Sequence, residues 1–181
     1  MQHSAESLTS NNLPHRAWIG AGSRDGERLD VMTEALRLLR GRGLDIVRVS
    51  SVYETEPVDL TGPGTVLNGA FEVAGAPAPA DLLAACLAVE KDLGRRREEG
   101  PEGARPIDLD ILLYDDLILD LPGLTVPHPR MHRRLFVLSP LAEIAPLALH
   151  PRCGMTVSAL LEACPRTSWV RLFAGPERWD R

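Results

Sequence analysis

Two segments with helical spacing alternate with short β-rich runs, and this order is the strongest constraint on the fold. Apolar residues recur at helical spacing over 27–39 and 79–93, and a glycine follows each segment. β-rich runs cover 17–19, 44–52, 67–73 and 107–113. The order β-α-β-β-α-β is that of a ferredoxin-like split βαβ unit. We therefore predict an α+β fold, a ferredoxin-like βαββαβ core with an antiparallel-rich sheet and packed helices.

The connections and the C-terminal part are less regular than these segments. Residues 20–26 predict a glycine-rich turn, and residues 57–64 break the β-rich pattern. Residues 95–106 contain almost nothing that can pack in a core, so we predict a mobile loop there. It leads into 107–113, which we predict as a central strand. A short helix is predicted to start over 133–138, and the last forty or so residues show no clear period.

Length and composition point to one soluble domain. The chain has 181 residues, of which 44% are hydrophobic and 25% charged, values typical of a globular protein. We predict a flexible tail over 1–15 and a single domain over 16–181, acting as a monomer. No apolar run is long enough to cross a membrane. The three cysteines form no CxxC pair and no apolar signal core precedes the domain, which favours the cytoplasm, and a net charge of −5 argues against nucleic acid as a partner.

The chemically most informative pair is Asp108 and Asp110. Residues two apart in a strand face the same side, so both carboxylates project together from an apolar run and need neutralising. Such pairs can hold Mg²⁺ with a polyphosphate. With twelve aspartates in the chain, a chance pair is the alternative. Arg105 and the cluster 95–97 precede the pair, and guanidinium groups bind phosphate, although a solvated charged face is the alternative there. Together the two features predict a nucleotide site.

Other nucleotide motifs are absent or incomplete. The only lysine, Lys91, lies inside a predicted helix without a glycine-rich approach, so there is no P-loop. Gly20, Gly22 and Gly26 resemble a dinucleotide fingerprint, but the third glycine is one place late. Any phosphoryl chemistry must therefore depend on arginine and metal.

Several single residues have both a functional and a structural interpretation. His128 and His132 have a spacing that can ligate zinc on a helix, but Pro129 separates them at a turn. We therefore predict a phosphate hydrogen bond for His128 and simple exposure for His132. Asn68 serves either the backbone or a ligand. Phe136 is either core or a stacking platform, and Cys86 is predicted to be core.

Taken in order, these blocks resemble the 6-hydroxymethyl-7,8-dihydropterin pyrophosphokinases of folate biosynthesis, over about residues 16–147. The residues that carry the resemblance are Trp18–Ser23, Val49–Val58, Asn68, Glu90 with Gly94–Arg97, Gly103–Leu112, Val126–Met131 and Arg134–Leu138. The family implies a ferredoxin-like fold. It also implies transfer of a pyrophosphoryl group from ATP to the hydroxymethyl group of a reduced pterin, with release of AMP and the use of two Mg²⁺ ions.

The resemblance also implies roles for individual residues. Asp108 and Asp110 would hold both Mg²⁺ ions, and Arg97 and Arg105 would act with them in catalysis. The implied ATP-binding residues are Glu90, Arg97, Arg105, Ile111, Thr125, His128 and Arg134. The implied pterin-binding residues are Thr55, Pro57, Val58, Asn68 and Phe136.

The sequence departs from the family pattern at four positions. Val66 stands where an aromatic residue usually covers one face of the pterin. Arg24 replaces an asparagine, Asp59 replaces a glycine, and Glu102 replaces a tryptophan present in some members. Two alternatives therefore stay open: a paralogue that acts on another small alcohol, and a catalytically silent ferredoxin-like binding module.

Overall fold

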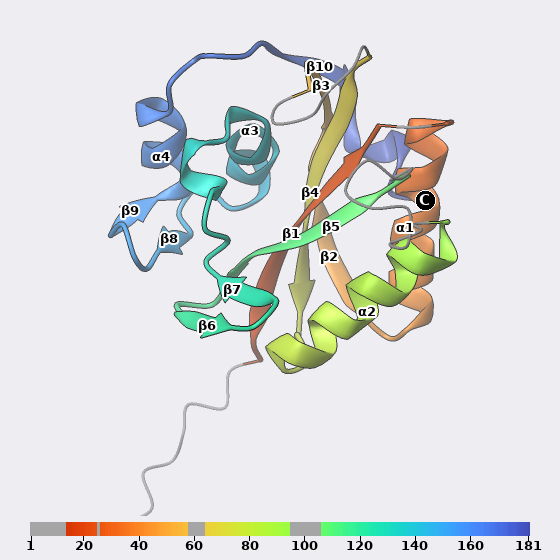
Figure 1. The fold of residues 1–181 in the computed structure, drawn as a ribbon, viewed down its shortest axis with the longest axis horizontal. Coiled ribbons are helices and arrows are strands. Elements are labelled where there is room, and N and C mark those ends of the chain that lie inside the picture. The colour runs from red at the N-terminus through yellow and green to blue at the C-terminus, as the bar shows by residue number, and fades with distance from the viewer. Residues whose placement is uncertain (1–13, 25, 58–63, 95–105) are drawn as a thin grey trace, which may run out of the picture.

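The computed structural model describes residues 14–24, 26–57, 64–94 and 106–181, which form a twisted sheet with helices on both faces (Figure 1). The elements in chain order are β1 (Arg16–Ser23), α1 (Arg28–Gly41), β2 (Asp45–Val49), β3 (Val52–Thr55), β4 (Val66–Ala74), α2 (Pro79–Asp92), β5 (Asp108–Tyr114), β6 (Leu119–Leu121), β7 (Leu124–Val126), η2 (Met131–Arg133), α3 (Leu135–Ile144), β8 (Leu149–His150), β9 (Met155–Thr156), α4 (Val157–Ala163), β10 (Val170–Ala174) and η3 (Pro176–Arg178).

The main sheet has six strands in the order β10-β3-β4-β1-β5, and β2 also pairs with β4. Neighbouring strands are antiparallel in each of these pairs. With β2 and β3 counted as one strand, the order is that of the ferredoxin-like split βαβ unit. The predicted fold class is therefore confirmed.

The two faces of the sheet have separate cores. Helices α1 and α2 pack on one face, and α3 and α4 lie on the other (Figure 1). In β1, Ala17, Ile19 and Ala21 point to the α1 and α2 core, because alternate residues of a strand face the same side. In the described part of the chain, no helix is long and apolar enough to cross a membrane.

Two sequence predictions for the first half are wrong in detail. The turn predicted over 20–26 begins later, because β1 runs to Ser23 and its glycines pair with strands on both sides. The strand predicted over 44–52 is two strands, β2 and β3, which meet at Ser50. There the main-chain N–H of Ser50 donates to Ala70 O at 2.9 Å, and Ser50 Oγ accepts from Ala70 N at 2.9 Å. These bonds hold the break against β4.

Strand β5 is at an edge of the sheet, not in its centre as predicted. Its apolar run arises because both faces are covered, with Leu109 in the α1 and α2 core and Leu112 in the other. Some of the main-chain hydrogen-bonding groups along its open edge also have partners. His128 N donates to Leu112 O at 2.9 Å, and Glu90 Oε1 accepts from Leu109 N at 2.8 Å.

The C-terminal residues form short elements that local periodicity does not reveal. The helix predicted from 133 is longer than expected, since α3 extends to Ile144 with Pro140 inside it. Strand β10 joins the main sheet beside β3, and Trp179 is fully buried in the core next to α1. The chain therefore ends beside α1 (Figure 1).

Candidate functional site

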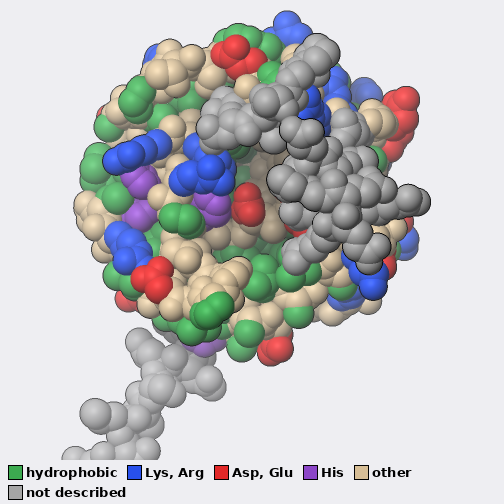
Figure 2. Space-filling view, in the orientation of Figure 1, with side chains coloured by type: hydrophobic (Ala, Val, Ile, Leu, Met, Phe, Trp, Pro, Cys, Tyr) green, Lys and Arg blue, Asp and Glu red, His purple; other side chains and the backbone are tan. Residues whose placement is uncertain are grey.

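The two aspartates lie on the face of β5 that α3 and α4 cover. Asp108 is half-buried and Asp110 is exposed, whereas Leu109 and Ile111 between and after them point into the opposite core. The predicted common orientation of the two carboxylates therefore agrees with the burial pattern of the strand. Figure 2 shows acidic, histidine and arginine side chains gathered beside one another near the middle of the face drawn.

Two glycines of β1 lie beside these carboxylates, and Gly22 leaves a strip of bare main chain, whereas the Leu112 side chain covers Gly20. Gly22 lies between Asn68 of β4 and Asp108 of β5, and Gly20 lies between Ala70 and Asp110. Since neighbouring strands are about 4.8 Å apart, Asn68 and Asp108 are separated by about 10 Å across the glycine. A Cβ atom on Gly22 would lie 3.6 Å from Asn68 Oδ1, so the amide oxygen faces this strip. This strip was not predicted from the sequence, although the two-residue spacing of Gly20 and Gly22 could have indicated it, because alternate residues of a strand share a face.

Asn68 is held by both its own strand and its neighbour. It is buried, and its Nδ2 donates to Thr55 Oγ1 at 3.0 Å and to Val66 O at 3.4 Å. Thr55 is buried as well. The amide nitrogen therefore satisfies local groups, while the oxygen faces the strip beside Gly22. Both sequence interpretations of Asn68 are compatible with this arrangement.

His128 and Arg134 bring the turn before α3 close to Asp110. Burial lowers the pKa of His128, Asp110 opposes this shift, and the positive charges of Arg134 and Arg130 add to it. The ring is therefore neutral at pH 7. Its Nδ1 accepts from Arg130 N at 3.3 Å, which leaves the ring proton on Nε2. His128 can thus donate one hydrogen bond to an anion without carrying a charge.

Phe136 lies next to the arginine in the first turn of α3. The guanidinium carbon of Arg134 is 5.4 Å from the centre of the Phe136 ring, a cation–π distance. Phe136 is half-buried, and the two buried clusters found among the described residues do not include it. The ring is therefore available as a platform beside a cation.

The remaining predicted residues differ in what they can contribute. Glu90 is buried and accepts from the main chain of Leu109, between the two aspartates, so it positions β5. The Ile111 side chain points into the opposite core, which leaves its main chain for contact with a ligand. Thr125 is half-buried in β7 opposite Asp120, and Pro57 is half-buried after β3. Val58, Arg97 and Arg105 lie outside the described residues.

A pocket of about 580 Å³ lies elsewhere, between α3, α4 and β10. Its lining includes Tyr53, Glu143 and Trp169, but neither aspartate, Asn68 nor Phe136. The candidate site is therefore identified by its functional side chains and not by this pocket. Cys86 is fully buried, as predicted, and burial, with smaller contributions from Glu90 and Asp110, raises its pKa to about 12.

Comparison with known proteins gives a consistent family. A model of 7,8-dihydro-6-hydroxymethylpterin-pyrophosphokinase matches residues 18–146. The chain is 43% identical over 135 residues to 2-amino-4-hydroxy-6-hydroxymethyldihydropteridine pyrophosphokinase of Bacillus subtilis, covering 74% of this chain and 78% of that protein. It is 39% identical over 149 residues to the protein of the same name from Synechocystis, covering 82% and 75%.

Longer relatives also contain a similar segment. The folic acid synthesis protein fol1 of Schizosaccharomyces pombe is 34% identical over 173 residues, which are 95% of this chain but only 23% of that protein. Among solved structures, a Plasmodium falciparum HPPK-DHPS with pteroate has a TM-score of 0.65 at 14% identity, covering 86% of this chain and 45% of the other. The structural likeness concerns the fold alone. Because the family match spans well over half of the sequence, this chain belongs to the 7,8-dihydro-6-hydroxymethylpterin-pyrophosphokinase family.

Proposed function

We propose that this enzyme, by family a pyrophosphokinase of folate biosynthesis, transfers a pyrophosphoryl group from ATP to the hydroxymethyl group of a reduced pterin at the strip beside Gly22. The observation that carries the proposal is the row Asn68, Gly22, Asp108 across three neighbouring strands. It places an amide suited to a pterin edge and carboxylates suited to a metal–phosphate group on either side of an unobstructed main chain. Acceptor and donor can therefore lie next to each other.

The donor set at the strip suits Mg²⁺. Asp108 and Asp110 supply carboxylate oxygens, the ligands that Mg²⁺ prefers, and the neighbouring Gly22 leaves room for phosphate and water. We propose that these two residues hold the ions. When bound there with ATP, Mg²⁺ would neutralise charge that develops on the phosphates.

The chain's other residues bind and orient the nucleotide. We propose that Arg134 pairs with phosphate oxygens and that His128 donates its Nε2 proton to the same group. Arg97 and Arg105 are proposed to hold the transferring group from the opposite side. Glu90 fixes the main chain of β5, and Ile111 and Thr125 are proposed to contact ATP. The reaction then forms a bond from the hydroxymethyl oxygen to the β-phosphorus and breaks the bond between the β-phosphorus and the oxygen that bridges to the α-phosphate. AMP is released, and the hydroxyl proton passes to solvent.

The acceptor side uses residues of β3, β4 and α3. Asn68 is proposed to bind the pterin edge through Oδ1, with Thr55 fixing the amide in place. Pro57 and Val58 are proposed to line the pocket, and Phe136 to stack on the pterin ring. Because Arg134 contacts Phe136, the ring that orients the acceptor adjoins the cation that binds the donor. No enzyme nucleophile is needed, since positioning and charge neutralisation supply the catalysis.

Incubation with ATP, Mg²⁺ and 6-hydroxymethyl-7,8-dihydropterin tests the proposal. AMP and the pterin diphosphate are expected in equal amounts. ATP binding without AMP release for this pterin, but with AMP release for another small alcohol, would favour the paralogue. Absence of Mg²⁺-dependent ATP binding would favour the silent module.

Two further expectations from the sequence concern the cellular compartment and the oligomeric state of the enzyme. The three cysteines are free thiols, which supports our proposal of a reducing compartment such as the cytoplasm. The monomeric state stays a prediction from the sequence.

Exchanging the aromatic platform is expected to change pterin affinity selectively. Phe136→Ala should raise the pterin Kd by about tenfold or more, because the stacking contact and its buried area are lost. Val66→Tyr should lower it by about fivefold by adding the second stacking face. Calorimetric titration with the pterin in the presence of a non-hydrolysable ATP analogue measures both effects. Phe173→Ala, at an exposed phenylalanine of β10, is the matched control. An unchanged Kd in Phe136→Ala would contradict the stacking role.

Filling the glycine strip is expected to block the site without unfolding the protein. A Cβ at Gly22 makes only ordinary contact at 3.6 Å, so Gly22→Val should keep the melting temperature within a few degrees. The added methyl groups would occupy the space between Asn68 and Asp108, and we expect kcat/KM to fall at least about tenfold. Gly41→Ala, where nothing lies within 4 Å, is the control. Wild-type kinetics in Gly22→Val would show that substrates do not use the strip.

A further inference from the structure

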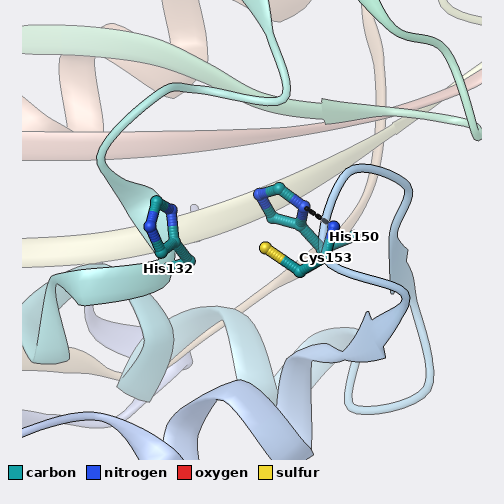
Figure 3. A group of neighbouring side chains, drawn as sticks. All are labelled: His132, His150 and Cys153. Atoms are coloured by element: carbon teal, nitrogen blue, oxygen red, sulfur yellow. Dashed lines mark hydrogen bonds between the residues drawn. The ribbon is translucent and has the colours of Figure 1, made fainter.

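Three side chains with metal-binding chemistry converge where η2 meets the β8–β9 hairpin. His132 lies in η2, His150 ends β8, and Cys153 lies in the loop between β8 and β9. One ligating atom from each residue lies within 4.8 Å of the other two. Figure 3 shows the Cys153 thiol pointing toward the space between the two rings. Two of the ligands, His150 and Cys153, are separated by two residues, the spacing found in many zinc sites.

Two of the ring nitrogen atoms at this cluster have no hydrogen-bond partner among the described residues. His132 Nδ1 and His150 Nε2 are both buried and make no hydrogen bond in the described part of the structure. His150 is only 2% exposed, so its ring is almost entirely removed from water. The exposure predicted for His132 is wrong, because the ring is half-buried and packs edge-on to His150 with 5.8 Å between ring centres. Buried polar atoms without partners are rare in folded proteins, and a missing ion is one explanation for them.

We propose that His132, His150 and Cys153 bind a Zn²⁺ ion, with water as the fourth ligand. Two imidazoles and a thiolate form a borderline-soft donor set, which suits Zn²⁺ and does not suit Mg²⁺. Tetrahedral zinc needs ligating atoms about 3.3–3.6 Å apart, as follows from Zn–N and Zn–S bonds of about 2.0 and 2.3 Å. The ligands, which lie within 4.8 Å of one another, therefore need to approach by about 1.5 Å at most. The exposed Cys153 lies in a loop with the left-handed Gly154 (φ 63°), which can supply this movement.

Binding has a definite proton balance. The Cys153 thiol loses one proton to solvent and binds as the thiolate. His150 Nδ1 accepts a weak hydrogen bond of 3.3 Å from Cys153 N, so the proton of the neutral ring is on Nε2. Zinc at Nε2 requires the proton to move to Nδ1 and the 3.3 Å contact to open. One proton per ion is therefore released in total.

The site would brace the segment that carries the nucleotide-binding residues. His132 lies between His128 and Arg134 in the chain, and zinc would tie this segment to the β8–β9 hairpin. The ion would act as a structural support. Its nitrogen and sulfur ligands differ in type from the carboxylate oxygens of Asp108 and Asp110. The proposal does not depend on the enzymatic activity.

Titration with Co²⁺ as a probe for zinc, in excess Mg²⁺ to fill carboxylate sites, separates the two kinds of metal site. We expect one Co²⁺ per chain and a thiolate-to-cobalt charge-transfer band in the near ultraviolet, which Zn²⁺ then displaces. Carboxylates cannot give this band. Cys86 and Cys164 are buried thiols with pKa values raised by burial, so the band reports Cys153.

Variants at the three positions and at one control position decide the assignment. Cys153→Ser, at an exposed loop position, should abolish the band, and His132→Gln should weaken Co²⁺ binding at least tenfold. His15→Gln, at an exposed histidine, should leave both unchanged. Saturating Zn²⁺ should raise the melting temperature of the wild type by about 5–10 °C at a hundredfold excess over Kd, and not that of Cys153→Ser. A missing band in the wild type, or a band that persists in Cys153→Ser, would overturn the proposal.

Discussion

Asp108→Asn and Asp110→Asn are each expected to lower kcat by about a thousandfold or more. Each change would remove a charged oxygen ligand from the Mg²⁺ ions that we propose at this site. Such ions are worth several kcal/mol in the transition state, and about 1.4 kcal/mol corresponds to a tenfold change in rate. The fold should persist, because one side chain is half-buried and the other exposed. The melting temperature of the apoprotein should stay the same or rise, since repulsion between the two like charges is relieved.

Metal binding and turnover should be measured on the same variants. Mn²⁺ binding in the presence of an ATP analogue should weaken in parallel with kcat. Asp116→Asn is the matched control, because this exposed aspartate lies just after the same strand. It should leave both quantities unchanged. Near-normal AMP release from either β5 variant at saturating Mg²⁺ would contradict the assignment of the two carboxylates.

The features that the sequence could predict are those encoded over short distances. Helical spacing located α1 and α2, and the two-residue spacing of Asp108 and Asp110 placed both carboxylates on one face. The burial of Cys86 likewise follows from the apolar side of one helix. In each case a local period determines which way a side chain points, and no distant partner is needed.

The features that escaped prediction depend on contacts between distant segments. Gly20 and Gly22 were interpreted as a turn, because only pairing with β4 and β5 reveals that they lie in a strand. Strand β5 was predicted to be central, because an edge strand that is covered on both faces has the same continuous apolar sequence as a central strand. His150 and Cys153 have no local signal that connects them with His132.

Trp179→Ala is expected to destabilise the protein by about 3–5 kcal/mol, the range for removing a large buried aromatic side chain. Trp179 is fully buried, and its indole N–H donates to Ser50 O at 2.8 Å. Ser50 is the residue at which β2 and β3 meet, so the C-terminal tryptophan holds the break in this strand. Denaturant unfolding should show the loss as a lower midpoint, and the melting temperature should fall by about 10 °C.

Matched variants separate the contributions of Trp179. Trp179→Phe keeps most of the ring and should lose about 1 kcal/mol from the hydrogen bond, together with a smaller packing loss. Trp169→Ala, at a 41% exposed position, should cost little. A Cβ at Gly69 would lie 2.7 Å from Trp179 Cζ2, so Gly69→Ala should destabilise the wild type.

The same Gly69→Ala change should be much less harmful in Trp179→Ala, because the cavity left by the indole receives the added methyl group. Strictly additive losses of stability in the double variant would show that the indole is not the reason why position 69 requires glycine. Gly69 directly follows Asn68 in β4, so the indole also fixes the main chain that holds the amide that we propose to bind the pterin. Trp179→Ala is therefore expected to raise the KM for the pterin at temperatures where the variant is still folded. An unchanged KM would confine the role of Trp179 to stability.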